Sequence, residues 1–177
     1  MDQKPVSLFK QLELSRFERA LDAINTLAFN RSLLTTMELE RVNGILTGKN
    51  GDPWRTEPVD LVLPSGKTQT YHLLQDPKLT ARDHLHRATE LAEEKGLVVD
   101  AAIDVYAGLV LAHVFNDANR RTAVLAAHYF LTRYGVPLSG LALHEIGLGD
   151  LREPGQIESL KETIHQMVKF AQKRGGK

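Results

Sequence analysis

The chain has 177 residues, the size of one ordinary globular domain with its own hydrophobic core. Basic and acidic residues number 22 each, so the formal net charge is zero and no overall field attracts nucleic acid or an anionic membrane surface. Cysteine is absent, which excludes disulfide frameworks and thiolate metal sites. The first residues lack the apolar stretch of a secretion signal, and no apolar run is long enough to span a bilayer. We therefore expect a cytoplasmic protein whose partners include neither nucleic acid nor membrane.

Two amphipathic helices are predicted in the first part of the chain. Ser15 and Glu18 have the spacing of a capping box, and apolar residues follow them at helical intervals. Thr35 and Glu38 repeat this box ahead of a second apolar stripe, which ends at a glycine. Residues 1–50 are therefore assigned to N-terminal helices.

The period of the apolar residues changes between residues 54 and 74, where a β-hairpin is predicted. Two β-rich runs, 59–63 and 68–74, are joined by a Pro-Ser-Gly-Lys turn. An exposed hairpin edge can hold an extended peptide by main-chain hydrogen bonds, whereas a hairpin that only covers the core is the structural alternative. Trp54 and Arg55, just before the first run, are interpreted as structural residues that hold the loop.

A third helix is predicted after the Asp-Pro pair at 76–77. Thr80 and Asp83 are interpreted as its capping box, and the helix is expected to close at Gly96. His84 and Asp83 stand in the order Asp-His, so the His-Asp dipeptide of a metal-dependent phosphohydrolase is not present at this point.

Two strongly apolar helices are predicted on either side of residues 113–121. The first spans 100–112 with Asp100 as its N-cap, and the second spans about 119–134 and ends before a glycine. This junction is expected to be the centre of a core segment, residues 76–137.

The last part of the chain, residues 139–174, is assigned to C-terminal helices. Ser139 can cap a short helix, and a Pro-Gly break at 154–155 precedes a final amphipathic helix. Taken together, the pattern predicts a mainly helical, all-α single domain over residues 1–177 with one small β-hairpin.

The junction at 113–121 reads HVFNDANRR and combines groups that suit phosphate chemistry. The start of a helix offers unpaired backbone N–H groups and partial positive charge, which together bind anions. Arg120 and Arg121 lie in that first turn, where a fixed cation opposes the helix dipole by about 0.3–1 kcal/mol, so an anionic ligand is needed to explain them. Asp117 offers a hard oxygen of the kind that Mg²⁺ uses beside substrate phosphates. His113, with an ordinary pKa near about 6.5, is the group able to accept a hydroxyl proton near neutral pH.

These residues resemble the signature of the Fic/Doc (Fido) family, written His-x-Phe-x, then Asp or Glu, Gly or Ala, Asn, Gly or Lys, and Arg. The matching positions are His113, Phe115, Asp117, Ala118, Asn119 and Arg121. Arg120 keeps the cation of the Lys-bearing branch, and Val124 stands where many AMP-transferring members carry a further arginine. The signature is therefore most similar to the Doc-like branch. Trp54-Arg55 also resembles an arginine that many members carry before the hairpin.

The resemblance implies a Fic/Doc-like helical core in which the hairpin at 54–74 is a flap beside the active site. It implies a transferase that moves AMP or the γ-phosphoryl group from a Mg²⁺-nucleotide to a Ser, Thr or Tyr hydroxyl of a target protein. Such an enzyme is a protein AMPylase (nucleotidyltransferase) or a protein-hydroxyl kinase, and a toxin is one role for it. The Doc-like features favour phosphoryl transfer.

The resemblance also implies the roles of the site residues. His113 is the catalytic base, and Asp117 is the ligand of Mg²⁺. ATP, or another nucleotide, is held through its phosphates by the residues Asn116, Ala118, Asn119, Arg120 and Arg121. The target protein is expected to dock along the hairpin at 59–74.

Two questions stay open at this stage. A catalytically silent module that binds a nucleotide or a partner protein is the alternative, although an intact His113 argues against it. Family toxins are often silenced by a helix with a Ser or Thr, three residues, then Glu followed by Gly or Asn. The nearest copy here, Thr36 to Glu40, is followed by Arg41, so an inhibitor is expected to be a separate antitoxin-like chain.

Overall fold

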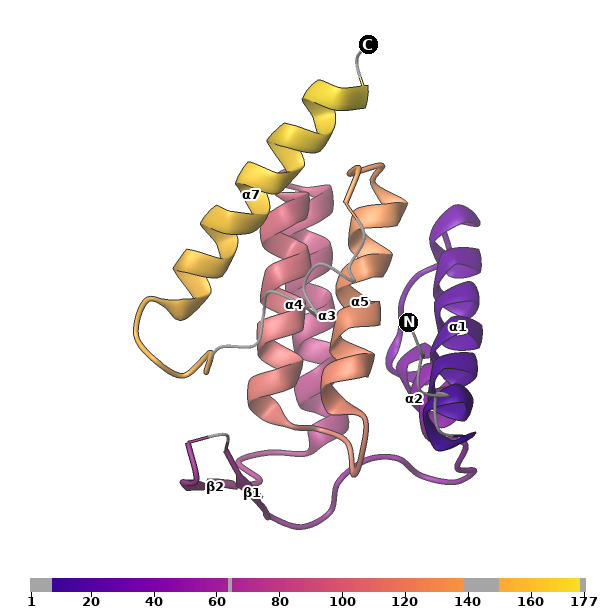
Figure 1. Ribbon diagram of the computed structural model, residues 1–177, viewed down its shortest axis with the longest axis vertical. Helices are drawn as coiled ribbons and strands as arrows, with labels where there is room; N and C mark the ends of the chain where they lie inside the picture. The colour runs from indigo at the N-terminus through magenta and orange to yellow at the C-terminus, as the bar shows by residue number, and fades with distance from the viewer. Residues whose placement is uncertain (1–7, 64, 139–149, 176–177) are drawn as a thin grey trace, which may run out of the picture.

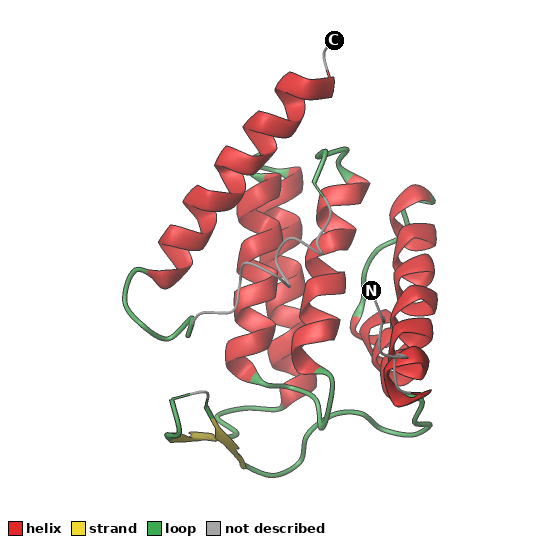
Figure 2. Cartoon of the chain, in the orientation of Figure 1, coloured by secondary structure: helices red, strands yellow, loops and turns green. Residues whose placement is uncertain are grey.

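Six helices and one two-stranded hairpin make up the described part of the chain. A computed structural model describes residues 8–63, 65–138 and 150–175. The helices are α1 (Leu8–Phe29), α2 (Thr36–Thr47), α3 (Pro77–Glu93), α4 (Val98–Ala112), α5 (Asn119–Arg133) and α7 (Gln156–Gly175). The mainly helical fold with one small hairpin is therefore confirmed (Figure 2).

The centre of the fold is a bundle of three helices that lie side by side, α3, α4 and α5 (Figure 1). The helices α1 and α2 pack on α5, and α7 crosses α4 obliquely on the opposite side of the bundle (Figure 1). Both α4 and α5 are buried on most of their faces, with Ile103, Tyr106 and Phe130 among the fully buried side chains. A helix that is apolar on most of its surface has to lie inside the protein, so the junction between α4 and α5 is anchored in the core.

The hairpin lies at the lower left of Figure 1, beside the end of the bundle where α4 turns into α5. Its strands, β1 (Val59–Val62) and β2 (Thr68–Tyr71), pair antiparallel with Val59 opposite Tyr71. None of the eight strand residues is buried, so side-chain burial contributes little to holding this element in place.

The prediction for α2 is confirmed, whereas the predicted start of α1 is wrong. Thr35 caps α2, because its Oγ1 accepts a hydrogen bond from Glu38 N at 3.3 Å, and Gly48 ends the helix at φ 67°. Ser15 lies inside α1, which already begins at Leu8. The residues before Ser15 include several strong helix formers, which extend the helix past the expected cap.

The predicted starts of α3 and α4 are also wrong. Asp76 caps α3, since its carboxylate accepts hydrogen bonds from the N–H groups of residues 78 and 79 at 2.8 and 3.0 Å. Pro77 is the first helical residue, where its missing N–H has no consequence. Asp100 lies in the first turn of α4 and pairs with the ring of His165 on α7, 3.2 Å away, so this carboxylate serves helix packing and not capping.

The remaining helical predictions fall into three groups. The helix α5 starts at the expected residue and ends at Arg133, one residue early. The final amphipathic helix is confirmed as α7, whereas the short helix expected after Ser139 lies outside the described residues. Within the described residues, no helix combines the length and the apolar character needed to cross a bilayer.

Candidate active site

The turn between α4 and α5 contains two residues other than glycine with left-handed backbone conformations. His113 ends α4 at φ 49° and ψ 55°, with its N–H bonded to Leu109 O at 3.0 Å. Ala118 precedes α5 at φ 56° and ψ 27°. A left-handed residue with a side chain costs about 1–2 kcal/mol, so the surrounding structure must support both positions.

Part of this support comes from Asn119, whose side-chain amide closes the turn. Its Nδ2 donates to Phe115 O at 2.8 Å, and its Oδ1 accepts from Phe115 N at 2.8 Å. The side-chain amide of Asn119 is thus engaged with the turn, and its predicted contact with a phosphate oxygen stays a prediction. A buried amide that satisfies both backbone groups of one residue fixes the turn firmly.

The segment before the hairpin gives the second support. Trp54 stacks on Phe115 with ring centroids 4.6 Å apart, and the two residues form an isolated antiparallel bridge. Asn116 donates its backbone N–H to Pro53 O at 2.9 Å and its side-chain Nδ2 to Trp54 O at 3.2 Å. The side chain of Asn116 thus holds the loop, which leaves its predicted role in nucleotide binding as a prediction.

A third support, which the sequence analysis missed, is Asn43 on α2. This buried amide donates from Nδ2 to Asp117 O at 2.9 Å and to Thr122 Oγ1 at 3.1 Å. Asn43 shares the buried face of α2 with Leu39 and Leu46, at helical spacing. A polar residue on an otherwise apolar stripe is the sequence signal that would have found it.

The imidazole of His113 lies half-buried between the hairpin and the helix end. Burial lowers the pKa of His113, and the neighbouring Arg55 guanidinium lowers it further. The ring packs against the ring of Tyr71 at the end of β2, with centroids 4.8 Å apart. A lowered pKa keeps the imidazole neutral at pH 7, which is the form that accepts a proton.

Asp117 exposes half of its side chain to solvent beside the start of α5. Its Oδ1 accepts from Ala118 N at 2.6 Å, and its Oδ2 lies 3.7 Å from Lys49 Nζ. Among the described residues, no group of three or more His, Cys, Asp or Glu side chains could hold a metal. This donor set fits Mg²⁺, which is commonly held by one or two carboxylates together with water and substrate phosphates.

The two arginines at the start of α5 have different neighbours. The intrahelical bonds of α5 begin with Thr122 N donating to Ala118 O at 2.9 Å, so the N–H groups of residues 119–121 precede the ladder. We call these three groups the anion cradle. Arg121 extends between two carboxylates, 3.6 Å from Glu13 and 3.8 Å from Asp117. Arg120 lies beside the buried Tyr106, whose pKa is raised by burial and partly lowered again by this guanidinium.

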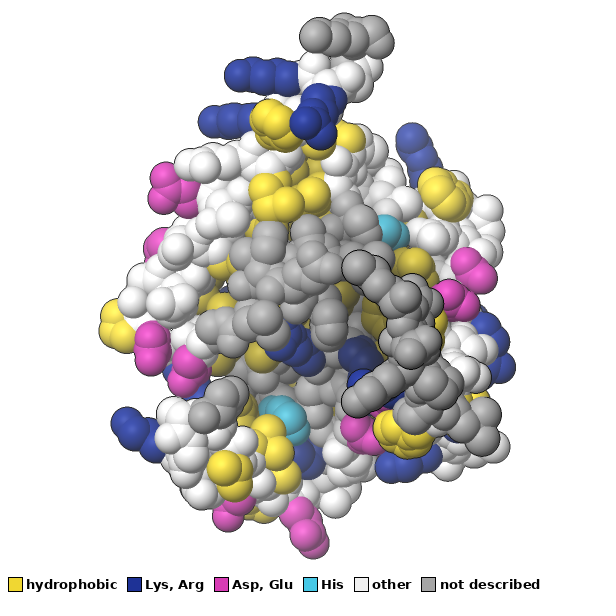
Figure 3. Space-filling view, viewed as in Figure 1, with side chains coloured by type: hydrophobic (Ala, Val, Ile, Leu, Met, Phe, Trp, Pro, Cys, Tyr) yellow, Lys and Arg dark blue, Asp and Glu magenta, His cyan; other side chains and the backbone are white. Residues whose placement is uncertain are grey.

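All the predicted site residues thus lie at one junction, at the end of the bundle that faces the hairpin. In the space-filling view, basic side chains and a histidine gather in the middle of this face, between the hairpin and the lower end of α1 (Figure 3). The sequence analysis missed Glu13 and Tyr71, because their contacts with the junction join parts of the chain that no local pattern connects.

Comparison with known proteins identifies a family. The model of the Fic/DOC family matches residues 32–131. A solved Fic-domain-containing signaling protein from Bacteroides thetaiotaomicron has a TM-score of 0.68 at 18% identity, covering 97% of this chain and 74% of that one. Fic-1 from C. elegans has a TM-score of 0.59 at 22% identity, covering 99% of this chain and 56% of that one. No curated protein sequence matches significantly. The two solved structures share the fold of this chain.

Proposed function

Because the chain belongs to the Fic/DOC family, we propose that it is a transferase that moves a phosphate-containing group from a Mg²⁺-nucleotide to a hydroxyl side chain of a target protein. One observation carries the proposal: the half-buried His113, whose pKa burial lowers, and the anion cradle of α5 are fixed at the two ends of one turn. Transfer of a phosphate-containing group needs little covalent chemistry from the protein, so positioning and charge stabilisation dominate.

Each residue has a defined task in this reaction. The target hydroxyl oxygen bonds to the γ-phosphorus while the bond from that phosphorus to the β–γ bridging oxygen breaks, and ADP leaves with the electron pair. His113 accepts the hydroxyl proton, and the cradle with Arg121 stabilises the charge on the phosphate oxygens. Asp117 would hold Mg²⁺, and the bound ion would neutralise negative charge on the nucleotide.

The γ-phosphoryl group, and not AMP, is the group that we propose to move. Position 124 is a valine with a fully buried side chain, so it supplies no cation for the distal phosphates of an AMP donor. Arg120 instead adds a cation within the first turn of α5, where the helix amides converge. A guanidinium also matches phosphate oxygens in a bidentate manner, which a lysine does not.

The target protein, in this proposal, pairs an extended segment with the outer edge of β1. Leu63 N donates to Lys67 O, so residue 63 directs its backbone groups toward β2. Because this direction alternates along a strand, the backbone N–H and C=O groups of residues 60 and 62 point away from β2, to the outer edge of β1. On the outer edge of β2, Thr70 O is already bonded to the Gln69 side chain. The chain before β1 leads to a cavity of about 220 Å³ that residues 55–59 line together with His113, which suits a hydroxyl side chain beside the base.

Intact-mass spectrometry tests the transfer. A cell lysate is incubated with Mg·ATP and wild-type protein, H113A or the matched control H86A, whose histidine is exposed on α3. We expect a target to gain one phosphate with wild type and H86A, and about 10²–10⁴-fold more slowly with H113A. A gain of AMP that H113A abolishes would replace the phosphoryl assignment but keep the transferase. The absence of any mass shift with the common nucleotides would contradict transfer and favour a silent nucleotide-binding or protein-binding module.

A further inference from the structure

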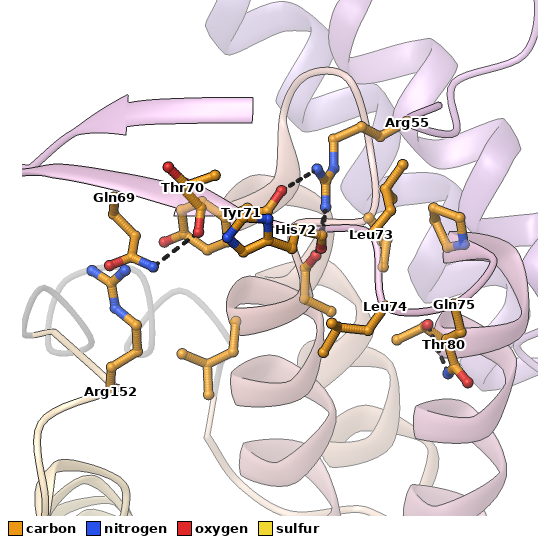
Figure 4. A pocket seen from close by; sticks show the side chains of 14 residues that line it. Arg55, Gln69, Thr70, Tyr71, His72, Leu73, Leu74, Gln75, Thr80 and Arg152 are labelled. Atoms are coloured by element: carbon orange, nitrogen blue, oxygen red, sulfur yellow. Dashed lines mark hydrogen bonds between the residues drawn. The ribbon is translucent and has the colours of Figure 1, made fainter. Parts of the chain in front are cut away.

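Arg55 is a buried arginine, 4% exposed, located between the end of β2 and the end of α4 (Figure 4). Its guanidinium has five N–H donors, and each meets a backbone carbonyl. These bonds run from Nε to His113 O (2.8 Å), from NH1 to Glu57 O (2.8 Å) and Tyr71 O (2.6 Å), and from NH2 to His72 O and Ala112 O (both 3.4 Å). One side chain therefore joins three separate stretches of backbone.

The charge of Arg55 is stabilised without an ion pair. Within the described residues, no carboxylate lies at ion-pair distance from this guanidinium, and a buried charge without compensation is strongly unfavourable. The acceptors Ala112 O and His113 O belong to the last turn of α4, where carbonyl groups lack intrahelical partners and the helix dipole is negative. Arg55 thus caps the C-terminus of α4 with a full positive charge.

The same contacts determine where the imidazole of His113 lies. The left-handed backbone of His113 is held on its carbonyl side by Arg55 Nε, and Arg55 N donates to Val114 O at 3.0 Å. At its other end the guanidinium holds Tyr71 O, and the ring of Tyr71 contacts the ring of His113 at 4.8 Å. Guanidinium, Tyr71 and His113 therefore form a closed loop of contacts. A cavity of about 630 Å³ borders this loop on the β2 side (Figure 4).

We propose that Arg55 is a positioning residue for the transfer, which fixes the base His113 relative to the hairpin that holds the target. This inference rests on the proposed function. None of the eight residues of β1 and β2 is buried, so Arg55 supplies a rigid link between the substrate-binding edge and the base. A lysine cannot replace it, because one ammonium has three donors and cannot span carbonyls on three segments.

The test compares R55K and R55Q with wild type and with R82Q, a matched control at an exposed arginine on α3. We expect kcat to fall about 10–100-fold in both Arg55 variants, because misplacement of a reacting group by about 1 Å has an effect of this size. The nucleotide Kd should change less than about threefold, since Arg55 makes no contact with the anion cradle. The acid limb of the pH–rate profile should move to higher pH in R55Q, because the Arg55 charge lowers the pKa of His113. R82Q should behave as wild type.

A second readout does not depend on activity. NMR can measure the contact between the His113 and Tyr71 rings in wild type and in R55K. The proposal requires that this contact is present in wild type and lost in R55K. Retention of this contact in a folded R55K, or a loss of kcat while the contact persists, would overturn the proposal. If R55Q does not fold, the result for R55K alone tests the proposal. If R55K does not fold either, Arg55 acts as a core residue and the proposal fails. A wild-type protein that transfers nothing would refute the proposed function, while the NMR result would still decide whether Arg55 positions His113.

Discussion

Both ends of α5 carry arginine, but the charge agrees with the helix dipole at one end and opposes it at the other. At the C-terminus, Arg133 agrees with the helix dipole and has several partners, including Glu93 at 3.4 Å and the rings of Tyr129 and Tyr134. At the N-terminus, Arg120 and Arg121 oppose the dipole, and Ala118 provides no side-chain cap. The charge at the C-terminus of α5 is therefore favourable for the helix dipole, whereas the charges at its N-terminus, where the candidate site is, are unfavourable.

This difference shows which end is built for a ligand. A cation at a helix N-terminus destabilises the helix until an anion arrives, after which the cation, the N–H groups and the dipole act together. At the C-terminus, Arg133 already agrees with the helix dipole, so no ligand is needed to reverse an unfavourable interaction there. Substitutions at the two ends should therefore separate ligand binding from stability.

The sharpest test compares Arg121→Ala with Arg133→Ala. We expect R121A to lower kcat/KM about 10²–10³-fold, because it removes a fixed cation from the transferring phosphate, and to leave stability unchanged or slightly higher. R133A should lower the free energy of unfolding by about 1–2 kcal/mol through the lost hydrogen bonds and ring contacts, with kcat/KM unchanged. Steady-state kinetics and urea titration measure both. If R121A and R133A both lower the free energy of unfolding and leave kcat/KM unchanged, the N-terminus of α5 has no special role in ligand binding.

The next largest effect concerns Asp117, which shares the N-terminal end with Arg121. Asp117→Asn keeps the acceptor for Ala118 N but removes the charge that would hold Mg²⁺, so we expect Mg²⁺-dependent nucleotide affinity to fall at least about tenfold. Calorimetry with Mg·ATP, with and without chelator, measures the change. Asp60→Asn, on the exposed hairpin, is the control. Equal affinity of D117N and wild type for Mg·ATP would remove Asp117 from the metal site.

The middle of α5 should respond to pH through stability. Burial lowers the pKa of His128, which faces α1 with its Nε2 2.8 Å from Asn25 Oδ1, and burial also lowers the pKa of His84 and His113. Because the unfolded chain takes up protons near pH about 6.5 and the folded chain only at lower pH, stability is complete above that value and is lost as pH falls below it. We expect the Tm to fall between pH 7 and pH 5, and to fall less in His128→Gln. In the exposed control His86→Gln, the Tm should depend on pH as it does in wild type. If the Tm of H128Q also falls as steeply with pH as that of wild type, His128 does not cause the pH dependence.

The sequence predicted the junction well and the helix starts poorly, for physical reasons. The turn at 113–121 was recognisable because its polar residues are close together in the chain and bordered by two apolar helices. The starts of α3 and α4 were misplaced because several residues compete for each cap, and tertiary contacts such as Asp100 with His165 decide which one is used. Arg55 was identified only as a loop residue, since four of its five carbonyl acceptors lie 16 or more positions away in the chain.

The smallest expected effect is at Glu13, the carboxylate of α1 that lies 3.6 Å from Arg121. This pair is the N-terminal counterpart of the pair between Glu93 and Arg133, but here the carboxylate competes with the ligand for the cation. A partly exposed ion pair is worth about 0–1 kcal/mol, so Glu13→Gln should raise nucleotide affinity by at most about fivefold.

The gain in E13Q should shrink as ionic strength rises, because salt screens exposed charges. Calorimetry with Mg·ATP at low and high salt measures it, and Glu18→Gln, an exposed substitution on the same helix, controls for the change in net charge. Equal gains in E13Q and E18Q would show that only net charge matters. A gain confined to E13Q would mean that Arg121, unlike Arg133, is held by a partner that the ligand displaces, and that the two ends of α5 differ in what their arginines are free to bind.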